Sequence, residues 1–171
     1  MTPEQLLEKT AAFCETLRVC LQRQVPQLGD FSRRLLQIIQ QLRKNMEVRD
    51  VTFANDFNNY VKQLREELNQ QEPVWTELRN QIRQVPDKEW TADLSLDAKG
   101  FNSRAKALSV TCDEFVDTYD KFCKQYKNFT AVKLNVWLLT SCQTDVMNVT
   151  GKMLFLAREL ARKTEQKKEA T

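Results

Sequence analysis

The stretch AKGFNSRAKALSVTCDEFVDTYDKFCKQYKNF, from Ala98 to Phe129, decides the fold class of this chain. Read at alternating steps of three and four residues, it holds ten uncharged positions in succession: Ala98, Phe101, Ala105, Leu108, Cys112, Phe115, Tyr119, Phe122, Tyr126 and Phe129. This spacing places all ten on one face of a helix. We therefore predict a long helix with an apolar face, and we call these ten positions the aromatic ridge.

The aromatic ridge needs a partner, because burying one Phe side chain is worth about 1.5–3 kcal/mol. A second copy of the chain is one candidate, through a coiled coil. Two-stranded coiled coils favour Ile, Val and Leu at their seam positions, whereas the last five ridge positions alternate Phe and Tyr. We expect the ridge to be buried by the rest of its own chain, and we keep self-association as the alternative.

The residues before Val48 predict two helices. Thr2, Pro3 and Gln5 form a capping-box sequence that begins the first. Pro26 and Gly29 are expected to end it. The second helix is expected to start after Asp30, a good N-cap, and to end near Val48.

Two further helices are expected on either side of the aromatic ridge. One follows Asp50 and reaches Pro86, with Pro73 either kinking it or starting a new turn. The other begins near Thr130 and reaches about Lys163, because apolar residues recur there every seven positions. The connection 85–99 lacks periodicity but contains Trp90, Leu94 and Leu96, so we expect it to pack back onto the helices.

Together these segments predict an all-α, up-and-down bundle of four to five long amphipathic helices. The chain contains only 3 Gly and 4 Pro, and such scarcity disfavours turn-rich β folds. We expect residues 1–163 to form a single bundle domain and residues 164–171 to be a polar tail or linker.

Composition also predicts the compartment. The first ten residues lack the basic and apolar regions of a signal peptide, and no apolar run approaches the ~18 residues of a membrane span. The five Cys include no Cys-x-x-Cys pair and do not resemble a secreted disulfide framework. We therefore expect a cytoplasmic protein with reduced thiols.

Catalytic motifs are missing from the sequence. It has no His, so neither a Ser-His-Asp or Cys-His nucleophile nor a His metal ligand can be built. The three Gly stand far apart and form no phosphate-binding loop. We expect no cofactor and no metal site, and we expect that the protein is not an enzyme.

The last predicted helix carries more apolar residues than one seam can use. Leu134, Trp137, Leu138 and Phe155 fall on other faces than the seven-residue repeat. Such a helix is either central in its bundle or presents a docking surface. We interpret these four residues as a candidate partner-binding face with Trp137 as its anchor, because Trp is enriched among binding hot spots.

Basic residues suggest a second kind of contact. Two groups, on the second and last predicted helices, are candidates for a basic surface: Arg33, Arg34, Arg158, Arg162, Lys163, Lys167 and Lys168. They could meet an acidic partner or an anionic membrane, although solvated helix faces would have the same composition.

These observations favour a non-catalytic adaptor or scaffold module that binds a protein partner through its apolar face and basic helix surfaces. The alternative is a peripheral membrane protein that acts through amphipathic helices and basic faces. A homo-oligomer stays open, whereas the mild net charge of +3 disfavours nucleic acid.

Overall fold

Four long helices make up most of the computed structural model, which describes residues 2–89 and 98–170, with backbone alone for residues 88, 98, 99 and 164–170. They are α1 (Pro3–Arg43), α2 (Phe53–Gln84), α3 (Ala98–Gln125) and α4 (Val136–Ala170), with a short 3-10 helix, η1 (Asp87–Glu89), after α2. No strand occurs among the described residues. The all-α prediction is confirmed, with four helices rather than five.

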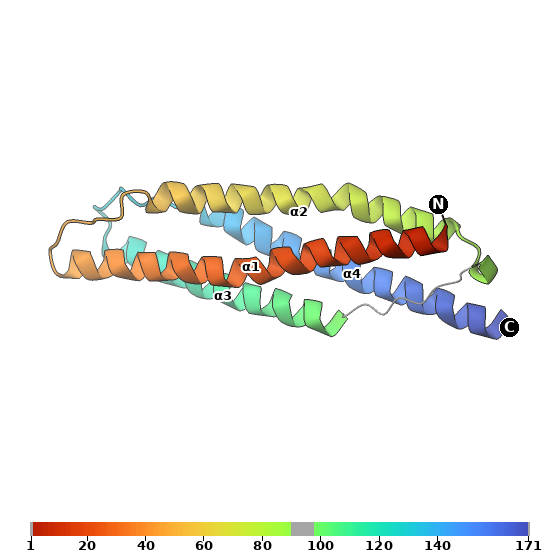
Figure 1. Ribbon diagram of the computed structural model, residues 1–171. Coiled ribbons are helices and arrows are strands. Elements are labelled where there is room, and N and C mark those ends of the chain that lie inside the picture. The colour runs from red at the N-terminus through yellow and green to blue at the C-terminus, as the bar shows by residue number, and fades with distance from the viewer. Residues whose placement is uncertain (1, 90–97, 171) are drawn as a thin grey trace.

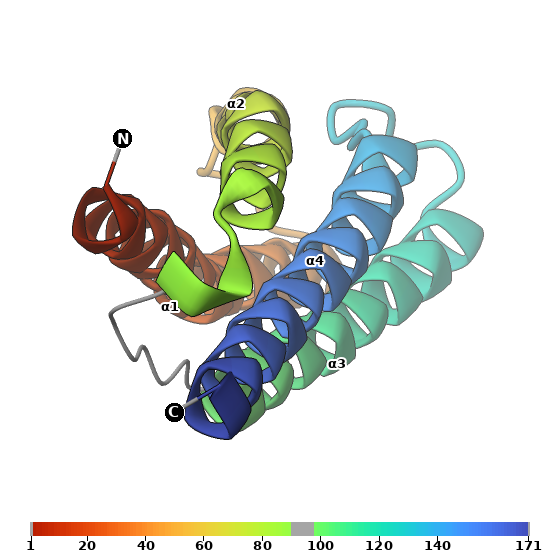
Figure 2. The same cartoon turned by 90° about the vertical axis from the view of Figure 1, so that its right-hand side faces the viewer.

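The helices alternate in direction along the chain, as Figure 1 shows, so α1 and α3 run one way and α2 and α4 the other. Both α1 and α4 pack against α2 and α3. Viewed along the bundle in Figure 2, the order around the axis is therefore α1, α2, α4, α3. This order places α2 and α3, which are consecutive along the chain, at opposite corners.

The aromatic ridge is buried inside its own chain, as expected. Its members from Phe101 to Phe122 are all at most 8% exposed, and Tyr126 and Phe129 pack against the core while half-buried. The side chain of Ala98 lies outside the described residues. At the centre, the rings of Phe57 and Phe115 stack with centroids 5.0 Å apart, and Phe31 meets Phe57 edge-on at 5.4 Å. Three helices thus meet on the ridge.

Helix α1 corrects the prediction of two separate helices. It begins with the expected capping box, in which Gln5 N donates to Thr2 Oγ1 over 3.2 Å and Thr2 N donates to Gln5 Oε1 over 3.0 Å. It then continues through Pro26 and Gly29. Pro26 is exposed, and the buried residues Leu21, Leu28 and Leu35 stay in register seven positions apart on both sides of it. Burial of this stripe outweighs the one backbone hydrogen bond that proline removes.

The end of α1 is a Schellman motif. Asn45 adopts a left-handed conformation with φ 52°, Met46 N donates to Gln41 O over 2.8 Å, and Asn45 N donates to Leu42 O over 3.2 Å. The expected joint near Val48 is therefore a defined turn. After it, Asp50 is not the expected helix cap, because α2 begins at Phe53 and Asp50 is bound by Arg34.

Helix α2 runs through Pro73 to Gln84, so Pro73 does not begin a separate helix. In the connection after it, Val85 is half-buried, whereas Trp90, Leu94 and Leu96 lie outside the described residues.

Helix α4 starts six residues later than predicted. Residues 130–135 are not helical: Val132 and Leu134 are buried, and Lys133 between them is exposed. The Tyr119 hydroxyl accepts from Leu134 N over 3.0 Å and bonds Val132 O at 3.4 Å, which pins this segment. Asn135 then caps α4 by accepting from Leu138 N over 3.0 Å. At the other end, α4 continues to Ala170, past the predicted start of the tail.

Candidate interaction surfaces

The described residues contain no group of three or more Cys, Asp and Glu side chains that could hold a metal ion. Four thiols are buried, and burial raises the pKa of Cys14 and Cys112 to about 12 and that of Cys20 and Cys142 to about 11. A thiol held protonated in this way is a poor nucleophile.

Two members of the predicted partner-binding face are buried, which corrects that prediction. Leu134 is 8% and Leu138 is 6% exposed, so both belong to the core. Phe155 is half-buried against Trp75, with ring centroids 6.3 Å apart, and the Arg83 guanidinium lies 5.1 Å from its centroid. Of the four predicted residues, only Trp137 stands in solvent, at 72% exposure.

Trp137 begins an outward face of α4 that carries no charge. Six exposed residues at helical spacing form it, and we call them the neutral face: Trp137, Thr140, Thr144, Met147, Asn148 and Gly151. Met147 is 54% exposed and borders a shallow hollow of about 440 Å³ against α3. Lys106 contributes the one charged side chain to that hollow. By contrast, the exposed face of α2 carries Lys62, Arg65 and Glu66 within one and a half turns.

Most of the residues predicted to form a basic surface bind other groups of the same chain. For two of them, Lys163 and Arg34, the prediction is corrected. Lys163 is 1% exposed, and its Nζ donates to Val85 O over 2.5 Å and to Asp87 Oδ1 over 3.1 Å. Arg34 is bound by two carboxylates, with Nε 2.6 Å from Asp50 Oδ2 and Nη2 2.8 Å from Asp56 Oδ2. The hydrogen bonds of Arg34 with Asp50 raise the pKa of the guanidinium and lower that of the carboxyl.

The other predicted basic residues do not form one patch. Arg33 is exposed and pairs with Asp30. Arg162 pairs with Asp87 at 3.5 Å and with Glu159 at 3.4 Å. Arg158 is exposed and has no ion-pair partner among the described residues. The side chains of Lys167 and Lys168 lie outside them.

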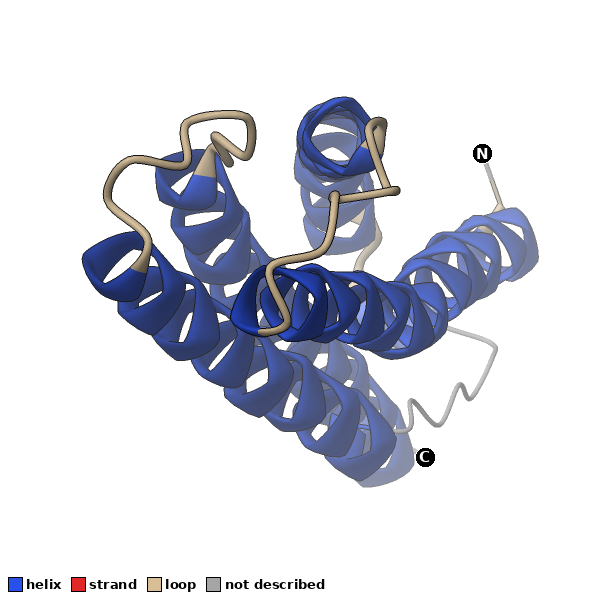
Figure 3. Cartoon of the chain, turned by 90° about the vertical axis from the view of Figure 1, so that its left-hand side faces the viewer, coloured by secondary structure: helices blue, strands red, loops and turns tan. Residues whose placement is uncertain are grey.

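A different basic surface lies at the end of the bundle that holds both the α1–α2 and the α3–α4 connections, and we call it the loop end. Figure 3 faces this end of the bundle, where Asn58, near the start of α2, ties the α3–α4 connection to that helix. Asn58 Nδ2 donates to Lys133 O over 3.1 Å, and Asn58 Oδ1 accepts from Asn135 N over 2.8 Å. Six cations there are exposed: Arg43, Lys44, Arg49, Lys124, Lys127 and Lys133.

None of these six cations has a carboxylate within ion-pair distance among the described residues. Three exposed apolar side chains share the loop end with them: Met46 at 43%, Val51 at 85% and Trp137 at 72% exposure. Our sequence interpretation assigned no function to Lys124, Lys127 and Lys133. The feature of the sequence that points to these three lysines is their position, within or beside the short segment that connects two long helices.

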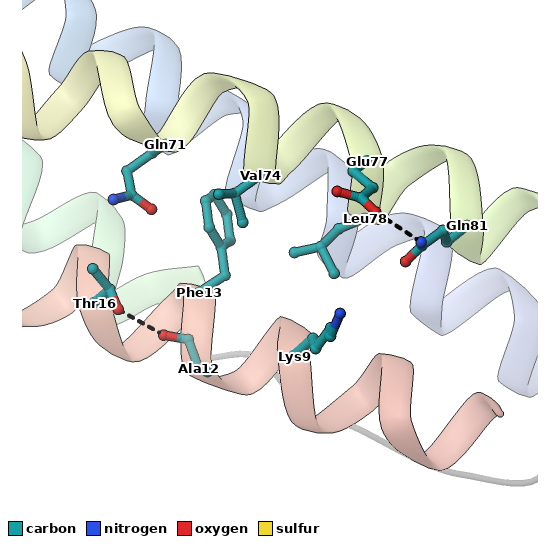
Figure 4. Close-up of a pocket in the computed structure, with 9 residues that line it drawn as sticks. All are labelled: Lys9, Ala12, Phe13, Thr16, Gln71, Val74, Glu77, Leu78 and Gln81. Carbon is teal, nitrogen blue, oxygen red and sulfur yellow. Dashed lines mark hydrogen bonds between the residues drawn. The ribbon is translucent and has the colours of Figure 1, made fainter. Parts of the chain in front are cut away.

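A groove between α1 and α2 is the third surface feature (Figure 4). It encloses about 420 Å³ over an apolar floor that includes Phe13, Val74 and Leu78. Some of its polar groups are bonded locally: Gln81 Nε2 donates to Glu77 Oε1 over 3.0 Å, and the Thr16 hydroxyl donates to Ala12 O over 3.0 Å. Lys9 and Gln71 also line the groove.

None of the described helices is both long enough and apolar enough to cross a bilayer. No family model, curated protein or solved structure matches the chain.

Proposed function

We propose that this chain is a non-catalytic adaptor or scaffold module that binds a protein partner on the neutral face of α4. One observation carries the proposal: from Trp137 to Gly151, every exposed side chain of α4 is uncharged, and the first of them is a Trp that is 72% exposed. A helix that only faced water would be expected to carry charged residues there.

The composition of the neutral face resembles the centre of a protein interface. Such centres are depleted of charged residues and enriched in aromatic residues and Met. Trp137 and Met147 supply the large side chains, and Thr140, Thr144 and Asn148 supply hydroxyl and amide groups that can exchange hydrogen bonds. At 1.5 Å per residue the face extends about 21 Å along the helix.

The partner that fits this face is itself uncharged along its contact. A charged group placed there would lose its water without gaining an ionic partner, which is costly. An amphipathic helix whose apolar side carries small polar residues meets this requirement and could lie in the hollow beside Met147.

A photo-crosslinking amino acid at Thr144 tests the proposal in the full chain. We expect a covalent adduct with a partner from native lysate. Excess unlabelled protein should abolish it, whereas excess Met147→Arg protein should compete about tenfold less well, because Arg puts an unpaired charge into the contact. Val19→Arg is the matched control, since Val19 is 41% exposed on α1 and should compete as well as the wild type.

The thermal unfolding of both variants should match that of the wild type, so that competition reports the surface alone. Equal competition by Met147→Arg and wild type would contradict docking on the neutral face. An adduct of twice the chain's own mass would make the occupant a second copy and contradict a foreign partner.

A further inference from the structure

The positive charge of the molecule is concentrated at the loop end. Residues 43–52 and 120–137 together contain seven Lys and Arg and three Asp and Glu, a net charge of +4. The whole chain has a net charge of +3, so all the remaining residues together are slightly negative. The small net charge of the whole chain therefore conceals that one end of the molecule is basic.

The carboxylates of the loop end do little to neutralise it. Asp50 is held by Arg34, and Lys121 pairs over 3.0 Å with Asp117, which lies just outside the residues counted above. The exposed Glu47 and Asp120 are the acidic groups left near the six unpaired cations. Cations gathered without partners repel one another, and an external anionic surface relieves that repulsion.

The exposed apolar residues of the loop end alternate with these cations along the chain. Val51 follows Arg49 and Asp50, Met46 follows Lys44, and Trp137 lies four residues after Lys133. Val51, at 85% exposure, has the largest exposed fraction of the large hydrophobic side chains that the structure describes. Cations beside Trp and aliphatic side chains are the combination found where proteins meet the headgroup layer of a membrane.

We propose that the loop end docks on the surface of an anionic lipid bilayer. The six cations contact headgroup phosphates and carboxylates, Trp137 enters the headgroup layer, and Val51 and Met46 reach the boundary of the acyl chains. The loop end is a different surface from the neutral face on which we place the protein partner, and Trp137 lies at the border between the two.

Two features favour a membrane over an acidic protein. Four of the six unpaired cations are Lys, which act as mobile point charges, whereas fixed carboxylates are best met by the planar fork of Arg. The cations also lie in or beside two connections at the same end of the bundle, an arrangement that a continuous charged surface satisfies without a matched pattern of acidic residues.

The loop end is built to dock without opening the bundle. The Schellman motif at Asn45 and the Arg34–Asp50 ion pair fix the first connection. The Tyr119 hydroxyl fixes the second through Leu134. The exposed side chains can therefore meet a bilayer while the aromatic ridge stays buried.

Sedimentation of the full chain with vesicles tests the proposal. We expect binding to vesicles of phosphatidylcholine mixed with phosphatidylserine, little binding to phosphatidylcholine alone, and release as salt rises. The triple variant Lys124→Gln, Lys127→Gln, Lys133→Gln should weaken binding by about two orders of magnitude. The matched control is Lys9→Gln, Lys106→Gln, Arg158→Gln, which loses the same charge away from the loop end and should weaken binding far less.

The apolar contribution is tested by Val51→Asp, which should lower binding at a salt concentration where the wild type still binds. No sedimentation of the wild type with anionic vesicles at low salt would overturn the proposal, as would equal losses in the two triple variants. Binding to immobilised polyglutamate as strong as to vesicles, and unchanged by Val51→Asp, would assign the surface to an acidic polypeptide instead.

Discussion

Gly29 shows that a residue unfavourable to helices does not end a helix when the positions around it in the sequence form a buried apolar stripe. It lies inside α1, and a Cβ built on it would meet no heavy atom within 4 Å apart from its chain neighbours and the nearby backbone of its own helix. Glycine in a helix interior costs about 0.5–1 kcal/mol relative to alanine, because the unfolded chain has more freedom to lose. The residue is therefore a local weakness that packing tolerates.

We predict that Gly29→Ala stabilises the protein by about 0.5–1 kcal/mol. Urea unfolding followed by circular dichroism should show a higher midpoint with an unchanged slope. The exposed neighbour Gln27→Ala should change the midpoint far less. A lower midpoint for Gly29→Ala would mean that α1 is interrupted there.

The cysteines divide by burial. At pH 8 we expect a thiol reagent to modify only Cys123 rapidly in the native protein, and all five thiols after denaturation, because Cys123 is the exposed one. Rapid modification of a second thiol in the native state would contradict the burial of Cys14, Cys20, Cys112 or Cys142.

The same four thiols predict a pH dependence of stability. Their pKa values are raised in the folded state, to about 11–12, from an ordinary value of 9.0. Unfolding therefore releases protons above pH 9, so the free energy of unfolding should be unaffected by them below pH 9 and fall between pH 9 and 12. Urea titrations across this range should show a shallower decline for Cys112→Ala than for the wild type.

At the scale of the element, apolar periodicity was sufficient to predict the aromatic ridge and the stripe of α2, since buried residues follow the helical repeat. It failed where residues that usually end a helix lie within a stripe of residues that tertiary packing buries. Pro26 and Gly29 resemble a helix end, yet the stripe from Leu21 to Leu35 continues through them. Val132 fits a repeat of seven with Leu139, although it lies in a non-helical segment in which buried and exposed residues alternate.

The candidate site was predicted less well than the fold, because exposure depends on how each helix is rotated. Trp137 and Leu138 are adjacent, and only the packing of α4 decides that one is exposed and the other buried. Lys163 did carry a signal, since it continues the seven-residue series Cys142, Val149 and Leu156. A cation at that seam position indicates a buried anion or carbonyl, which the sequence could not locate.

We predict that Lys163→Met lowers the free energy of unfolding by about 1–3 kcal/mol, because it leaves Val85 O and Asp87 without their buried donor. Hydrogen exchange should also become faster at residues 85–89. Arg158→Met on the same helix should change neither measurement, since Arg158 is exposed. Equal stability of the two variants would refute a structural role for Lys163.

At the scale of the whole molecule, two properties were beyond the reach of sequence periodicity. Apolar stripes predict that the helices pack together, but they do not show which helices are neighbours. The order of the helices around the bundle axis, α1, α2, α4, α3, is therefore known only from the structure. Net charge likewise averages over the surface and conceals the loop end, which exists because two connections far apart in sequence lie at the same end of the bundle.

The central claim is that an intact bundle acts through its outer surface while the aromatic ridge stays inside. Hydrogen exchange of the full chain, free and bound to anionic vesicles, tests it most directly. We predict slower exchange at residues 44–52 and 126–137 on binding, with exchange along Phe101–Phe122 unchanged. Faster exchange along Phe101–Phe122 in the bound state would show that the ridge leaves its own chain, and it would contradict the claim.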